Sequence, residues 1–146
     1  MSTKAKSIAY WTTTVLVAFF MSGGVVQIAQ FKANPHGVVP ELGYPMYFFA
    51  IIGFWKVLGA IAILVPRFPR LKEWAYAGIF FDLTGAAISH ACSGDPVGKV
   101  ATPLIFLLLA AASWALRPPA RAWKPNSVPA KSAEAFTSSE KAAAHA

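Results

Sequence analysis

The 146-residue chain is 56% hydrophobic and only 13% charged, with a formal net charge of +7. Soluble globular domains average about a quarter charged residues, so this composition indicates an integral membrane protein of one domain. Lysine and arginine gather at the ends of apolar runs, with no basic stripe interleaved with exposed aromatics, and we therefore expect no nucleic-acid partner. The single cysteine, Cys92, excludes an intrachain disulfide and CxxC redox chemistry.

The first apolar run predicts a membrane-spanning helix over residues 8–29, because about 20 apolar residues cross a bilayer. A signal peptide is the alternative, since a basic start precedes the run. The run is too long for a signal core and no A-x-A cleavage site follows it, so we expect an uncleaved helix. Ser22, Gly23 and Gly24 form a small-residue patch suited to close helix contact.

Three further helices are expected after a polar connection rich in breaker residues. The second covers residues 44–65 and ends at a proline. A short basic turn at 66–72 leads to the third, over residues 73–92, and a short loop containing Gly-Asp-Pro leads to the fourth, over residues 99–116.

Small and polar residues recur at helical spacing on one face of the third predicted helix. This stripe consists of Gly78, Asp82, Gly85, Ala86 and Ser89. We expect it to face other helices and not lipid.

Positive charges are divided unequally between the two sides of the predicted bundle. One side would hold Lys4, Lys6, Arg67, Arg70, Lys72, Arg117, Arg121 and Lys124, and the other only Lys32 and Lys99. The positive-inside rule therefore places both termini and the 66–72 turn in the cytoplasm. Residues 117–146 are rich in Ala, Pro, Ser and Lys and lack an apolar period, which predicts a disordered cytoplasmic tail. The expected fold is all-α: an integral membrane four-helix bundle over residues 1–116, followed by this tail.

Four segments of the chain carry a family resemblance: LGYPMYF at 42–48, GFWKVLGAIAILVP at 53–66, FPRLKEWAYAG at 68–78 and FFDLTGAAISH at 80–90. They resemble the DoxX-like family of small four-helix bacterial membrane proteins, and the similarity extends from Tyr10 to about Leu116. The resemblance implies a multi-pass bundle in the bacterial inner (plasma) membrane. The family takes its name from a subunit associated with quinol-linked redox complexes, while most DoxX-like members have no assigned activity.

Lys56 and Asp82 lie near the centres of the second and third predicted helices. In an antiparallel hairpin both charges fall at one depth, about 15 Å from the turn at 1.5 Å rise per residue. Each charge at a helix centre costs about 2.5–3.5 kcal/mol on insertion-based scales, so such residues usually find partners inside the bundle. Two interpretations stay open: a structural ion pair, or a functional site that relays protons or ions or forms a polar floor for a ligand.

His90 lies two helical turns beyond Asp82, and Gln27 lies at a similar depth on the first helix. Together they could present hydrogen-bonding groups to a head group such as a quinone, or both could be polar residues at helix ends, partly in water. Membrane b-type haems need two axial histidines, and His90 is the only intramembrane one, so we expect no haem. The sequence has no metal-ligand cluster, so we expect no metal either.

Three functions remain for a protein that we do not expect to be a stand-alone enzyme, because no hydrolase, kinase or metalloenzyme motif is present. We rank first a non-catalytic subunit or scaffold, in a quinol-linked redox complex. A quinone- or lipid-binding oxidoreductase accessory built on Lys56, Asp82, Gln27 and His90 comes second, and a small proton or solute transporter third. The expected partners are the lipid bilayer, other membrane or redox subunits, and a second copy of the chain.

Overall fold

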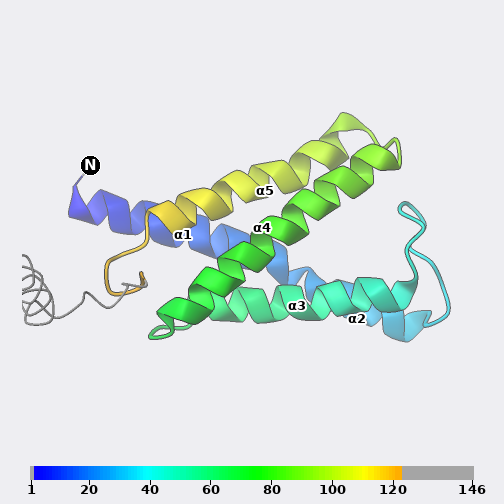
Figure 1. Ribbon diagram of the computed structural model, residues 1–146, viewed down its shortest axis with the longest axis horizontal. Coiled ribbons are helices and arrows are strands. Elements are labelled where there is room, and N and C mark those ends of the chain that lie inside the picture. Colours follow the sequence, from blue (N-terminus) through cyan, green and yellow to red (C-terminus); the bar gives the residue numbers. More distant parts are fainter. Residues whose placement is uncertain (1, 123–146) are drawn as a thin grey trace, which may run out of the picture.

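The computed structural model describes residues 2–122, which form five α-helices and no β-strands. The helices are α1 (Thr3–Ser22), α2 (Gly24–Ala33), α3 (Met46–Leu64), α4 (Pro69–Cys92) and α5 (Val97–Ala115). Because α1 continues into α2 across a bend at Gly23, the helices make four rods (Figure 1). The predicted all-α four-helix bundle is therefore confirmed.

The observed helices cover the predicted ones, with different ends. The first rod runs from Thr3 to Ala33, beyond 8–29 on both sides, because the Ser2 hydroxyl accepts a hydrogen bond from the Ala5 amide at 3.2 Å and caps α1 early. Helix α4 starts at Pro69 instead of residue 73, since a proline in the first turn loses no hydrogen bond that it would otherwise make.

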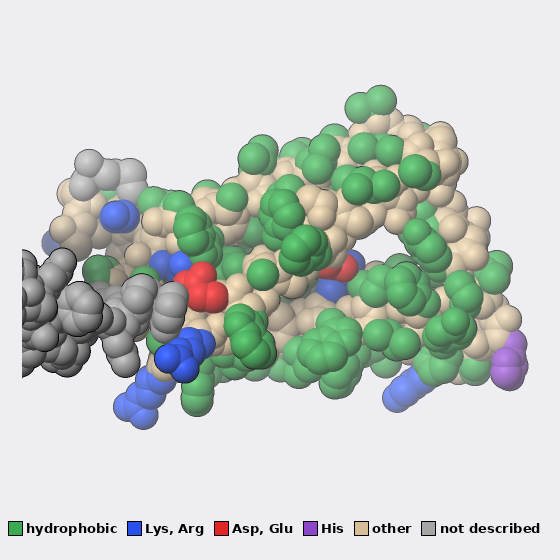
Figure 2. Space-filling view, viewed as in Figure 1, with side chains coloured by type: hydrophobic (Ala, Val, Ile, Leu, Met, Phe, Trp, Pro, Cys, Tyr) green, Lys and Arg blue, Asp and Glu red, His purple; other side chains and the backbone are tan. Residues whose placement is uncertain are grey.

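Three rods are long and apolar enough to cross a membrane: Thr3–Ala33, α3 and α5. Helix α4 has 24 residues, which is sufficient length, but it carries more charge. Large apolar side chains cover much of the visible face, as expected for a protein that contacts lipid (Figure 2).

The bundle is closely packed at one end and open at the other. Helices α1, α3, α4 and α5 enclose a core made of Val17, Ala18, Met21, Ala60, Ile63, Tyr76, Ile79, Leu83 and Ala110. Helix α2 packs on α3 and makes no comparable contact with α4 or α5. The α2–α3 pair therefore diverges from the α4–α5 hairpin (Figure 1). We call the open side, with the connections 34–45 and 93–96, the loop end, and the side with the α3–α4 turn the hairpin end.

The expected small-residue stripe on α4 is wrong in part. Gly78 and Gly85 are exposed, and a Cβ built on either would have no neighbour within 4 Å. Helix α4 instead buries a face that includes Tyr76, Ile79 and Leu83, because these larger side chains make more van der Waals contacts with the neighbouring helices.

The α3–α4 turn is stabilised by a buried lysine. The side chain of Lys72 is fully buried, and its ammonium group donates hydrogen bonds to the carbonyl oxygens of Ala62, Ile63 and Val65. These carbonyls lie at the C-terminus of α3, where the helix itself offers no partners. Lys72 therefore acts as a cap for α3 and not as a free loop charge.

A hydrogen-bonded group of hydroxyls lies inside the hairpin end. The Ser113 Oγ is 2.6 Å from the Thr14 hydroxyl oxygen and 2.7 Å from that of Tyr76, and all three residues are buried.

Residues 117–122 of the predicted tail pack against this end: Arg117 pairs with Glu73 at 2.6 Å, and Arg121 lies over the Trp11 ring at 4.5 Å. The rest of that tail, 123–146, lies outside the described residues.

Candidate ligand-binding cleft

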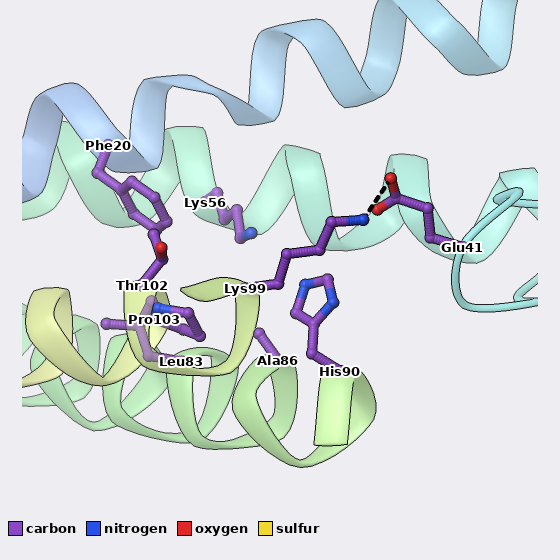
Figure 3. Close-up of a pocket in the computed structure, with 9 residues that line it drawn as sticks. All are labelled: Phe20, Glu41, Lys56, Leu83, Ala86, His90, Lys99, Thr102 and Pro103. Atoms are coloured by element: carbon purple, nitrogen blue, oxygen red, sulfur yellow. Dashed lines mark ion pairs between the residues drawn. The ribbon is translucent and has the colours of Figure 1, made fainter. Parts of the chain in front are cut away.

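A cleft of about 330 Å³ lies where the two helix pairs diverge, at the loop end of the bundle. All four rods and the 34–45 connection contribute to it (Figure 3). Its apolar lining comes from Phe20, Leu83, Ala86 and Pro103, and its polar lining from Glu41, Lys56, His90, Lys99 and Thr102.

Lys56 and Asp82 form an ion pair at the deep end of the cleft. The Lys56 Nζ lies 3.5 Å from the Asp82 Oδ2, and the two side chains are 14% and 18% exposed. This distance suits an ion pair but is long for a hydrogen bond, and Asp82 Oδ2 is buried without a hydrogen-bond partner among the described residues. Of the two, Lys56 lines the cleft and Asp82 is not among its lining residues.

Gln27 does not join the other candidates in the cleft. It lies in the contact between α2 and α3, where a Cβ on Gly53 would be 2.9 Å from the Gln27 Cβ. Its Oε1 is buried and has no hydrogen-bond partner among the described residues. The structure therefore places Lys56 and His90 in the lining of one cleft, with Asp82 paired to Lys56, and leaves Gln27 in the neighbouring helix interface.

His90 belongs to a charged network at the loop end of the cleft. Its Nδ1 lies 2.7 Å from Asp95 Oδ2, and Asp95 Oδ1 lies 3.3 Å from the Lys99 ammonium. Lys99 in turn pairs with Glu41 at 2.7 Å. The hydrogen bond from His90, helped by Lys99, holds the pKa of the Asp95 carboxyl below its ordinary value of 3.8.

The connection 34–45 folds over this end of the cleft. Its own hydrogen bonds join the Val39 amide to the Tyr44 carbonyl at 2.8 Å and the Met46 amide to the Gly37 carbonyl at 2.9 Å. It is tied to the α4–α5 hairpin by the Glu41–Lys99 ion pair and by the Tyr44 hydroxyl, which lies 3.0 Å from that of Ser89.

Sequence reasoning missed Glu41, Asp95 and Lys99. The i, i+4 spacing of Asp95 and Lys99 across a helix start was a readable signal for their pairing. No local signal could have found Glu41, because its partner lies 58 positions away, between residues 41 and 99.

The cleft can offer both an ammonium donor and an imidazole to a polar head group, beside apolar walls. An ammonium group donates hydrogen bonds, and a neutral imidazole donates with one ring nitrogen and accepts with the other. The fold and the cleft together define a multi-pass helical membrane protein with charged groups in its interior.

The family model for the DoxX-like family matches residues 11–113, and the chain belongs to this family. Comparisons with curated proteins and with solved structures give no match.

Proposed function

We propose that the protein is a non-catalytic membrane component that binds an amphiphile of the quinone or lipid class, with the polar head of the ligand in the cleft. The observation that supports this most is the position of Lys56, which lines the cleft while Asp82, outside the cleft lining, compensates its charge. A purely structural ion pair would be packed against other side chains. Here one side of the ammonium group faces space large enough for a head group, near the lower limit for ligand pockets.

On the sequence alone, a scaffold or subunit of a quinol-linked redox complex ranked first and quinone or lipid binding ranked second. Because of the cleft, we now rank ligand binding first. Membership of a redox complex is compatible with it and stays a prediction. Affinity purification in mild detergent would test it, since a chain that always runs alone argues against stable partner subunits.

A transporter is less favoured because an apolar layer separates the two polar regions of the bundle. Along α1, the core residue Val17 lies between the buried Thr14 and the cleft residue Phe20, and the core residue Met21 follows directly after Phe20. Along α4, Tyr76 is followed by the core residue Ile79 before the helix reaches Asp82. A transporter would need a polar path between these regions, and the core side chains fill that space.

We further propose that the hairpin end faces the cytoplasm of a bacterial cell and that the cleft lies in the outer half of the inner membrane. Support comes from the positive charges at the hairpin end, which include Arg67, Arg70 and Arg121. Lys4 and Lys6, which are exposed on the first turns of α1, lie at the same end. Cysteine labelling from the two sides of sealed vesicles would test this orientation, using residue 41 and residue 70 as the reporting positions in a Cys92→Ser background.

Organic extraction of the purified protein, followed by mass spectrometry, tests the proposed function. We expect the parent to retain one quinone or one lipid class, enriched over the bulk membrane in about stoichiometric amount. The matched variant is the double replacement Lys56→Met with Asp82→Leu, which removes both charges together and leaves neither unpaired. Loss of the enriched compound in a folded double variant supports the proposal, and a parent without any enriched amphiphile rejects it.

A further inference from the structure

His90 is fixed in the cleft in one orientation. Its Nδ1 is directed at Asp95 Oδ2 at 2.7 Å, and its side chain is 20% exposed. Figure 3 shows the imidazole rising from α4 into the cleft, below the side chain of Lys99 and across from Lys56. Gly94, with φ of 71°, lets the chain turn sharply enough after α4 to return Asp95 to this position.

The proton on the imidazole is assigned by its partner. An ionised carboxylate can only accept hydrogen bonds, and the lowered pKa of Asp95 keeps it ionised at neutral pH. Nδ1 must therefore be the donor in the bond to Asp95. In the neutral ring, Nε2 then holds a lone pair and is an acceptor without a proton.

The charged groups that surround the ring leave this lone pair available. Asp95 from the loop 93–96 bonds the opposite nitrogen, and Lys99 of α5 is engaged by Glu41 and Asp95. Lys56 of α3 is held by Asp82. The Thr102 hydroxyl donates to the Gly98 carbonyl at 2.8 Å, so its proton is used within α5.

We propose that Nε2 of His90 accepts a hydrogen bond from a hydroxyl on a ring of the occupant, so that the cleft selects a hydroquinone-type head group over one without a hydroxyl. Phe20, Leu83 and Pro103 supply the apolar walls against which such a ring would lie. Asp95 acts as a positioning residue because it fixes which ring nitrogen is the acceptor. This inference rests on the proposed function, since it names the chemistry of the same ligand.

A direct test measures binding of three probes to the full chain in nanodiscs: a hydroquinone with a ten-carbon tail, its dimethyl ether, and the corresponding quinone. In the parent we expect the hydroquinone to bind about three- to tenfold more tightly than the ether, the range for one hydrogen bond. In His90→Phe, which keeps a ring but removes the acceptor, the advantage should fall to about onefold. A parent that binds hydroquinone and ether equally overturns the inference and leaves the proposed function standing, whereas a parent that binds none of the probes overturns both.

A second variant keeps the inference testable if His90→Phe does not fold. In Asp95→Asn, either the amide oxygen or the amide nitrogen can face Nδ1, so the tautomer of the imidazole is no longer fixed. The advantage of the hydroquinone over the ether should then be smaller than in the parent. The quinone, whose carbonyl oxygens only accept hydrogen bonds, should bind less tightly than the hydroquinone to the parent. An advantage in Asp95→Asn equal to that of the parent contradicts the assignment.

Discussion

A Cβ placed on Gly24 would lie 2.2 Å from the carbonyl oxygen of Gly53, and one on Gly53 would lie 2.6 Å from the carbonyl oxygen of Gly24. The backbones of α2 and α3 therefore touch at a point where only glycine fits. This contact joins the first rod to the helix that carries Lys56, whose Cβ would be 3.0 Å from a Cβ on Gly24. The Gly24–Gly53 contact thus sets the position of one wall of the cleft.

We predict that Gly24→Ala lowers the stability of the protein by about 1–3 kcal/mol, because the added methyl group meets backbone that cannot move aside. Thermal unfolding in detergent measures this. The matched control is Gly85→Ala on α4, where a Cβ has nothing within 4 Å. That replacement should leave the unfolding temperature unchanged or raise it slightly, since alanine favours helix over glycine by about 1 kcal/mol. Equal effects of the two replacements would show that α2 and α3 are not in backbone contact.

Lys72→Met should destabilise the α3–α4 turn by about 1.5–3 kcal/mol, because three carbonyl groups at the end of α3 lose a charged donor. Methionine keeps most of the apolar stem, so the change isolates the ammonium group. Arg70→Met removes a positive charge from the same helix start, but Arg70 is exposed, and it should change stability by less than about 0.5 kcal/mol. If the two variants unfold alike, Lys72 has no capping role.

Single replacement of either member of the Lys56–Asp82 pair should cost about 3–5 kcal/mol, because the remaining charge stays inside the bundle without compensation. Lys56→Ala and Asp82→Ala should each lower the folded yield, and the double replacement with apolar residues should recover part of it. Size-exclusion chromatography in detergent measures the folded fraction. Single variants that accumulate like the parent would mean that the pair is solvated and contributes no coupling.

The network at the loop end should weaken in acid. The folded-state pKa of Asp95 lies below its unfolded value. The stability that the Asp95 carboxylate contributes to the fold is therefore complete above the unfolded pKa and is lost as pH falls through the folded pKa. The difference in unfolding temperature between the parent and Asp95→Asn should thus be constant near neutral pH and shrink below about pH 4. A difference that persists undiminished in stronger acid would show that the carboxylate charge of Asp95 is not what ties His90 and Lys99 together.

Much of the fold was predictable because it depends on local pattern. Apolar runs between proline-containing breaks predicted four rods, and the two isolated charges predicted the facing sides of α3 and α4. The bend at Gly23 and the Gly24–Gly53 contact were only partly readable: the small-residue patch indicated a close approach but not its partner. The same reasoning failed at Gly78 and Gly85, because small residues at helical spacing also occur on a face that no helix covers.

The site was predictable only where spacing along a helix determines which residues share a face. The shared depth of Lys56 and Asp82, and the shared face of Asp82 and His90, follow from their positions along α3 and α4. The partners of His90 and Lys99 depend on how two loops fold, and the cap formed by Lys72 depends on a turn in which Arg67 adopts φ of 78°. The charge count assigned Lys72 and Lys99 to opposite sides of the membrane and gave no information on what each contacts.

Photoaffinity labelling tests the central claim most directly, because it asks where an amphiphile binds. A quinone with a diazirine in its tail would be irradiated with the protein in nanodiscs, and the labelled residues mapped by mass spectrometry. A groove of about 320 Å³ at the hairpin end, which includes Ala77, Ala111 and Trp114, serves as the internal control, because a similar volume there lacks Lys56 and His90. We predict labelling concentrated on the cleft segments 83–90 and 99–103, and its loss in Lys56→Met with Asp82→Leu; labelling spread evenly over the lipid-facing surface, or equal in the two grooves, would contradict the account.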